Sequence, residues 1–139
     1  MSPPQAYKVC HIRDGRFMSY VDVLSEAAPE SRIEYRLNEW VKPVIENSCL
    51  YAFREYDDAS SFIRCENWID KQFGIFECDV KDIWQRRMAY EVCDEKVLLR
   101  FWEDPYSYSC LPDGAICCGQ VMLKKMMALV QGTVITKVA

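Results

Sequence analysis

The sequence predicts an α+β protein: a single domain over residues 1–139, built on an antiparallel or mixed β-sheet with one or two covering helices. Three observations support this fold class. The 139 residues fit one domain. Half of them are hydrophobic and 13% are aromatic, which is enough apolar surface for a stable core. Apolar residues alternate with polar ones in several short runs, as they do in half-buried strands.

The N-terminal part of the chain has the pattern of a hairpin. Residues 6–12 and 17–24 are rich in strand-forming side chains, and Asp14-Gly15 lies between them. Asp-Gly favours the tight turns that join antiparallel strands, because those turns need positive φ angles. We therefore expect two paired strands here, followed by an exposed loop over residues 25–31.

A third strand is predicted over residues 32–37, where polar and apolar residues alternate. Ile33, Tyr35 and Leu37 are expected to face the core, with charged residues facing outward. Pro43 has no backbone N–H to donate, so strand pairing is expected to end near it.

The middle of the chain predicts a strand–helix–strand unit. Residues 49–54 form a compact apolar run, and Asp57 or Asp58 is suited to cap a helix that follows it. Residues 75–80 then alternate as a second strand. Two sets of side chains are expected to face the core: Ala59, Phe62, Ile63 and Ile69 from the helical segment, and Phe76, Cys78 and Val80 from the strand.

The second half of the chain is less regular in its pattern, which leaves open whether it is mainly strand or mainly helix. Residues 120–130 have helical propensity, with a broad apolar stripe rich in methionine. Residues 112–114, Pro-Asp-Gly, are a turn sequence. The remaining expectations are a short helix or continuing strand over residues 83–95, a strand over 97–102 and a terminal strand over 133–138.

Net charge, the N-terminal residues and hydropathy argue against non-specific nucleic-acid binding, export and membrane association. A formal net charge of −4 argues against non-specific nucleic-acid binding, which depends on a basic field. The first residues lack the basic and apolar regions of an export signal. Residues 121–130 are interrupted by Lys124 and Lys125 and are too short to span a bilayer. We expect a soluble cytoplasmic protein (in the host cytoplasm if it is viral) that does not associate with membranes.

Eight cysteines are many for this length. Without an export signal we expect them to be reduced, and mostly buried as small hydrophobic side chains. A structural zinc site normally has close Cys-x-x-Cys pairs, and none is present; an unusual metal site is the alternative. The adjacent Cys117 and Cys118 would point to opposite faces of a strand. The sequence thus predicts no metal site and no cofactor.

The signatures of common enzyme classes are missing from the sequence. His11 is the only histidine, and no Gly-x-Ser-x-Gly nucleophile elbow accompanies it. The five glycines are scattered, so neither a P-loop nor a dinucleotide-binding fingerprint can form. Asp57 and Asp58 are more simply a helix cap, and Glu77 with Asp79 is more simply the solvated face of a strand.

One segment has the composition of a ligand site. Tyr35, Arg36 and Trp40 lie around the predicted end of a strand. Arginine and aromatic side chains together bind planar or phosphorylated ligands by stacking and forked hydrogen bonds. The alternative is structural, with Trp40 packed under a loop and Arg36 paired with an acid. A second aromatic cluster, typical of an interface or a core edge, comprises Phe101, Trp102, Tyr106 and Tyr108.

Five pieces of the chain occur in a distinctive order: EYRLNEWVKP (34–43), LYAF (50–53) with Ala59 and Phe62, IFECDV (75–80), PDGA (112–115) and VMLK (121–124). In this order of features the chain resembles a group of small uncharacterised proteins from phages and prokaryotes. None of the pieces is a catalytic signature, so the resemblance implies a phage-related origin and no particular activity.

A looser resemblance is to the ADP-ribosyltransferase fold, which combines short strands with a helix and binds NAD through arginine or histidine, tyrosine and glutamate. It implies Arg36 and Glu77 as candidate residues. The Ser-Thr-Ser element of one branch and the His-Tyr pair of the other are both absent, so an ADP-ribosyltransferase activity has only these two residues to support it.

Together these patterns predict a small non-enzymatic protein that binds or sequesters a nucleotide-type ligand or a host protein, as an inhibitor would. Two alternatives remain open: a nucleotide-acting enzyme with Glu77 as its acidic residue, and a structural or assembly protein. Homo-oligomers are also expected if the methionine-rich residues 122–129 leave apolar surface outside the core.

Overall fold

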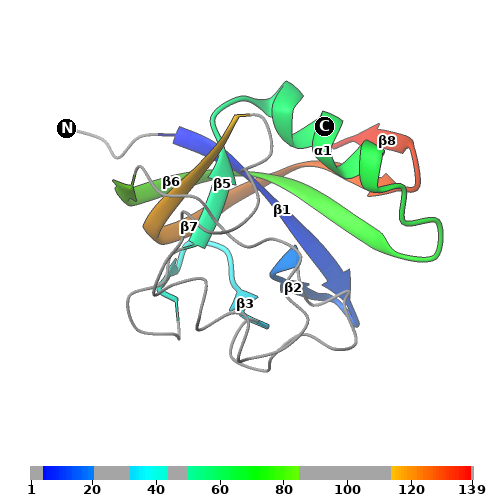
Figure 1. Cartoon of the computed structure of the whole chain (residues 1–139). Coiled ribbons are helices and arrows are strands. Elements are labelled where there is room, and N and C mark those ends of the chain that lie inside the picture. The colour runs from blue at the N-terminus through cyan, green and yellow to red at the C-terminus, as the bar shows by residue number, and fades with distance from the viewer. Residues whose placement is uncertain (1–4, 21–31, 44–49, 85–113, 139) are drawn as a thin grey trace, which may run out of the picture.

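The computed structural model describes residues 5–20, 32–43, 50–84 and 114–138, which form one antiparallel β-sheet and one helix (Figure 1). The structure contains the predicted antiparallel sheet and a covering helix, although strands make up more of it than the sequence suggested. The strands are β1 (Gln5–Arg13), β2 (Arg16–Met18), β3 (Glu34–Tyr35), β4 (Trp40–Val41), β5 (Leu50–Phe53), β6 (Gln72–Trp84), β7 (Ala115–Gln131) and β8 (Val134–Lys137), and the helix α1 is Tyr56–Glu66.

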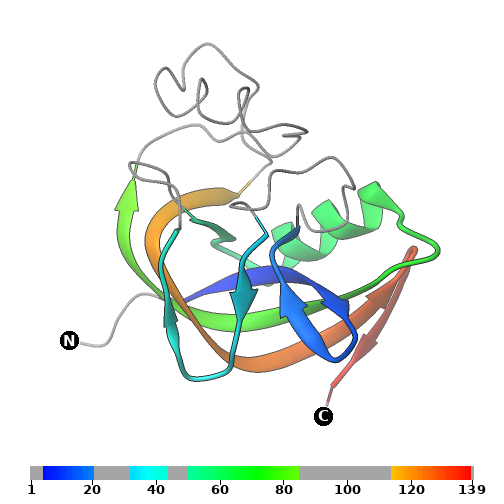
Figure 2. The same ribbon diagram turned by 90° about the horizontal axis from the view of Figure 1, so that it is seen from below.

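Four of these strands close into a ring. β6 pairs with β1 along one edge and with β7 along the other. β5 joins the two ends, because it pairs with β7 and its Phe53 also lies opposite Tyr7 of β1. β6 and β7 curve strongly across the molecule, as Figure 2 shows. β2 and β3 extend the β1 edge, while β4 and β8 pair with further parts of β7.

Two bulges bend β7 and explain why the pattern of its residues did not distinguish a strand from a helix. The register with β6 skips Lys124 and Met127, so strict alternation of inward and outward side chains is broken twice. Residues 120–130, which have helical propensity, are strand throughout. Their bulged apolar spacing imitates the stripe of an amphipathic helix, whereas a straight strand would have shown a period of two.

Core side chains are divided between the two faces of the sheet. Cys117 belongs to the cluster beneath α1 and Cys118 to the cluster on the opposite face, which confirms that these neighbours point in opposite directions. Phe76, Cys78 and Val80 are fully buried in the second cluster, also as predicted. The cluster beneath α1 includes Val9, Phe53, Ala59, Ile63, Phe73 and Ile75.

The predicted hairpin is present. β1 and β2 are joined by Asp14 and Gly15, whose φ angles are 53° and 75°. β2 ends at Met18, earlier than the sequence suggested. The next residue, Ser19, binds the segment before β3 instead: its N–H donates to the Ile33 carbonyl at 2.7 Å, and its hydroxyl accepts from the Ile33 N–H at 3.0 Å.

The strand predicted over residues 32–37 is reduced to the two residues of β3. Tyr35 is buried as expected, but Leu37 is 44% exposed, so its assignment to the core was wrong. The chain turns directly after β3, where Asn38 adopts a positive φ of 64°. This turn carries Leu37 away from the sheet.

The predicted helix is present with two differences. Its N-cap residue is Glu55, which makes no side-chain cap, so the predicted cap by Asp57 or Asp58 is wrong. Both aspartates lie in the first turn, where their charge favours the helix dipole. Ile69 is 73% exposed rather than buried, because the helix ends at Asn67 in the left-handed conformation.

The last predicted strands are confirmed where the structure describes them. β6 contains residues 75–80 and continues to Trp84, so the segment 83–95 begins as a strand. β8 confirms the terminal strand. The remaining predictions for residues 85–113, including the strand over 97–102 and the second aromatic cluster, lie outside the described residues.

Candidate functional site

The predicted ligand-site residue Trp40 begins β4, which pairs with β7. Its neighbour Val41 packs against the second core cluster, so Trp40 points to the other face and is half-buried. Across the sheet, Met122 and then Asp79 lie in the same row. The Lys81 Nζ, from β6, lies 3.9 Å from the centre of the Trp40 ring. The sheet thereby places a cation on the face of an aromatic ring.

Arg36 lies at the other end of the turn that precedes β4. The turn is fixed to the sheet, because the Asn38 N–H donates to the Leu123 carbonyl of β7 at 2.8 Å. The Arg36 side chain is 69% exposed, and its Nε is 3.8 Å from a Glu34 carboxylate oxygen. The structure therefore brings Arg36 and Trp40 to the two ends of one anchored turn.

Glu34 binds Arg16 more closely than it binds Arg36. Its Oε1 accepts a hydrogen bond from the Arg16 Nη2 at 2.9 Å, and this bond is the main cause that lowers the pKa of the Glu34 carboxyl. Arg36 adds a weaker attraction at longer range. The exposed guanidinium of Arg36 is thus accessible to a group from solution.

Tyr35 is separated from this surface. It is only 1% exposed, and the Lys8 Nζ of β1 lies 5.2 Å from the centre of its ring. The three predicted site residues therefore divide into two groups: Arg36 and Trp40 share the turn at the surface, whereas Tyr35 belongs to the interior.

Lys8 is the centre of a buried polar cluster that was not predicted from the sequence. It is 1% exposed, its Nζ donates to the Tyr51 carbonyl at 2.6 Å, and the same atom lies 4.1 Å from the centre of the Tyr51 ring. A carbonyl and two aromatic faces offset part of the cost of burying this cation. The available signal was alternation, since Lys8 lies between the buried Ala6 and Cys10 in the i±2 pattern of β1.

The thiols near Lys8 are not activated. Burial raises the pKa of Cys10 and Cys118 to about 12, and it raises the pKa of Cys78 further. The charge of Lys8 lowers all three values without cancelling the effect of burial. Since the thiolate is the nucleophilic form, these cysteines are unreactive at neutral pH.

The other residues considered for catalysis lie on separate elements. His11 is buried, with its ring centre 5.4 Å from that of Phe73. Glu77 lies on β6 and accepts a hydrogen bond from the Gln5 Nε2 at 2.6 Å, whereas Arg36 lies on the turn before β4. The enzyme alternative built on Glu77 stays a prediction.

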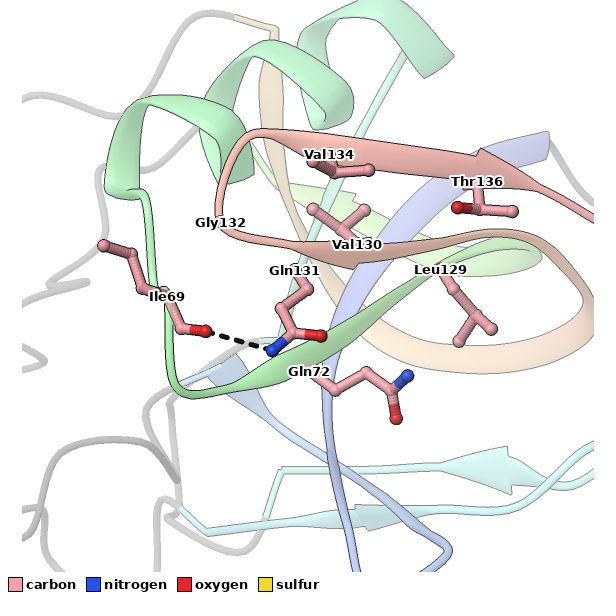
Figure 3. Close-up of a pocket in the computed structure, with 8 residues that line it drawn as sticks. All are labelled: Ile69, Gln72, Leu129, Val130, Gln131, Gly132, Val134 and Thr136. Atoms are coloured by element: carbon pink, nitrogen blue, oxygen red, sulfur yellow. Dashed lines mark hydrogen bonds between the residues drawn. The ribbon is translucent and has the colours of Figure 1, made fainter.

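A hollow of about 430 Å³ opens where β8 meets the end of β7 and the start of β6 (Figure 3). Across one side of it, the Gln131 Nε2 donates to the Ile69 carbonyl at 3.1 Å. Its lining carries no charged residue and combines Ile69, Leu129 and Val134 with Gln72, Gln131 and Thr136.

Within residues 5–20, 32–43, 50–84 and 114–138, the His, Cys, Asp and Glu side chains form no group of three or more that could hold a metal ion. The helix described there has 11 residues, too few to cross a membrane.

No protein-family model, no curated protein and no solved structure matches this chain. The resemblance to phage proteins therefore stays a prediction, and function is argued from the geometry of the described residues.

Proposed function

We propose that this protein is a non-catalytic binding protein that holds an anionic, planar ligand of the nucleotide type at the turn between β3 and β4. The observation that carries this proposal is the juxtaposition of Trp40, with the Lys81 Nζ 3.9 Å from its ring centre, and the exposed Arg36 at the other end of the turn.

The chemistry of these side chains suits such a ligand. An indole ring stacks on a nucleobase whatever its identity, because every base has a π face. Arginine forms two parallel hydrogen bonds to a phosphate, and lysine adds a compact positive charge. Lys81 now occupies one face of the Trp40 ring, and a stacked base would displace it toward the phosphates.

Charge around the turn supports an anionic ligand over a neutral one. Lys42 is exposed two residues after Trp40, so the turn and the strands beside it carry three cations, Arg36, Lys42 and Lys81, in a chain of net charge −4. Glu39 and Asp79 are also nearby in sequence or register, which makes the surface mixed rather than uniformly basic. Selectivity is therefore expected from stacking and forked hydrogen bonds more than from the overall field.

The turn is preorganised for binding. Val41 is packed against the core, and Asn38 donates to the Leu123 carbonyl, so the turn is held at its middle and at its β4 end before a ligand arrives. A preorganised site loses less conformational entropy on binding than a flexible one. This favours retention of a ligand, the activity expected of a sequestering protein.

The test is calorimetric titration of the protein with ATP and with NAD, with adenosine as a probe that lacks phosphate. We expect ATP or NAD to bind and adenosine to bind more weakly. Trp40→Ala is expected to abolish binding, and Arg36→Lys to weaken it about tenfold, because lysine cannot form the forked bond.

Lys137→Ala is the matched control for Lys81→Ala, since each removes one exposed lysine whose Nζ lies over an aromatic ring, Tyr56 for Lys137 and Trp40 for Lys81. Only Lys81→Ala is expected to weaken binding, and thermal unfolding would establish that each variant is folded. Failure of the wild-type protein to bind any of these probes, or equal binding by a folded Trp40→Ala variant, would overturn the proposal.

A further inference from the structure

β8 is an edge strand of the sheet that the structure describes. Among the described residues it pairs with β7 alone, and Figure 2 shows it as the outermost strand on its side of the molecule. The Val138 N–H donates to the Met127 carbonyl at 2.9 Å. Because hydrogen-bonded pairs alternate along antiparallel strands, the N–H groups of Ile135 and Lys137 point toward the open edge.

Exposed apolar side chains lie next to this edge. Val134 is 66% exposed and Ile69 is 73% exposed, and both line the hollow of about 430 Å³ (Figure 3). Leu129 contributes a partly buried side chain from β7. Apolar groups beside unpaired backbone donors and acceptors are typical of surfaces that accept another strand.

We propose that the open edge of β8 and this hollow form a docking site for an extended segment of another protein. The segment adds to the sheet as a further strand, pairing with the backbone of Ile135 and Lys137, and inserts an uncharged apolar side chain between Val134 and Ile69. The site is separate from the turn at Trp40, and it does not depend on the function proposed there.

The chemistry of the surface favours an extended peptide with an apolar side chain. Only another extended backbone supplies donors and acceptors at the spacing of a strand edge. The lining of the hollow is uncharged, which favours an apolar side chain from the partner. Lys137 is the one charged residue of β8, so an acidic residue beside it would add to the preference.

The size of the surface argues for a short segment and against a second copy of this chain. β8 has four residues and spans about 14 Å. A stable dimer usually buries roughly 20–30 residues on each partner, far more than this edge and hollow provide. The methionine-rich residues 122–129 add little to it, since Leu129 is the one of them that lines the hollow and Leu123 and Ala128 are fully buried.

The test begins with selection of short random peptides displayed on phage against the immobilised full chain. The consensus peptide is then synthesised and titrated against two pairs of variants. Lys137→Pro removes the outward N–H, while Lys137→Ala keeps it and removes the same side chain. Val134→Asp places a charge at the hollow, while Val134→Ile keeps it apolar.

We expect the selected peptides to alternate apolar and polar residues. Lys137→Pro and Val134→Asp are expected to weaken binding at least about tenfold, with Lys137→Ala and Val134→Ile within about twofold of wild type. Amide NMR spectra would show that each variant keeps the fold.

Three outcomes would overturn the proposal. The first is that no peptide is enriched. The second is that the enriched peptide binds Lys137→Pro as tightly as Lys137→Ala. The third is a dimer, seen by sedimentation of the protein alone, that Lys137→Pro dissociates, because the edge would then belong to a second copy.

Discussion

The ammonium group of Lys8 lies 4.1 Å from the centre of the Tyr51 ring and donates a hydrogen bond to the carbonyl of the same residue at 2.6 Å. Tyr51 thus offers this buried cation both an aromatic face and an oxygen. Tyr35 provides a second aromatic face at 5.2 Å. The contact joins β1 to β5 at the point where the ring of strands closes, so Lys8 stabilises the closure with its side chain.

Lys8→Ala is therefore expected to destabilise the protein by about 3 kcal/mol, because it leaves a cavity and removes the hydrogen bond to Tyr51. Lys8→Met fills the same space without the charge and is expected to cost less than about 1.5 kcal/mol. Urea unfolding of the two variants measures the difference. Equal stability of Lys8→Ala and the wild type would show that the buried contact contributes nothing to ring closure.

The cysteines are expected to differ sharply in accessibility. Iodoacetamide at neutral pH should label the exposed Cys65 in the folded protein and leave Cys10, Cys78, Cys117 and Cys118 unmodified. Peptide mass spectrometry before and after unfolding in guanidinium gives the comparison. Modification of Cys10 as rapid as that of Cys65 in the folded protein would contradict the burial described for it.

Alkaline pH is expected to destabilise the fold. The pKa of Cys10 is raised by burial from 9.0 to about 12, so the unfolded chain loses this proton at a lower pH than the folded chain. The protonated Cys10 thiol contributes to the free energy of unfolding. This contribution is fully present below pH 9 and is lost as pH rises toward 12, by up to about 1.4 kcal/mol per pH unit. Between pH 9 and 12, the free energy of unfolding should fall less steeply with pH for Cys10→Ala than for the wild type. Equal slopes would contradict the raised pKa of Cys10.

Gly74 is expected to tolerate no side chain. A Cβ added there would lie 2.6 Å from the Phe76 Cε2 and 3.4 Å from the Ile12 Cδ1, which places it against a fully buried ring. Gly74→Ala should cost about 1–3 kcal/mol through this overpacking. Gly15→Asn is the control, since no atom lies within 4 Å of its Cβ position and asparagine tolerates a positive φ. Thermal unfolding that ranks Gly15→Asn below Gly74→Ala would contradict this packing.

A binding protein without catalytic activity leaves its ligand intact. Mass spectrometry of ATP and NAD incubated with the protein is expected to show no new product. Product formation that Glu77→Gln eliminates, with binding retained, would replace the proposed function with the enzyme alternative. The same result would leave the peptide-docking site at β8 unaffected, because Glu77 lies outside it.

The sequence predicted the elements whose signals are local. Asp14-Gly15 determines its own turn, and Phe76, Cys78 and Val80 alternate without interruption, so the first hairpin and the inward face of β6 were correct. Residues 120–130 could not be assigned to strand or helix from the sequence, because a bulge is determined by the partner strand, which lies far away in the chain.

The candidate site was predictable to a smaller extent. The composition of the segment led to Arg36 and Trp40, but Lys81 comes from β6 and reaches Trp40 only through the pairing of both strands with β7. Burial of Lys8 was missed because a lysine in a strand is normally solvated, and only tertiary contacts compensate its charge here. Leu37 and Ile69 are exposed because turns direct them away from the sheet. Hydropathy alone could not distinguish them from buried core residues.

β7 also determines when this protein can fold during its synthesis. The strands β4, β5, β6 and β8 all pair with it, and it begins only at Ala115. A ribosome must therefore translate most of the chain before β4 and β5 find the partner described here. The sheet is expected to form only after β7 has left the ribosome, and until then the nascent chain exposes strand edges that chaperones can recognise.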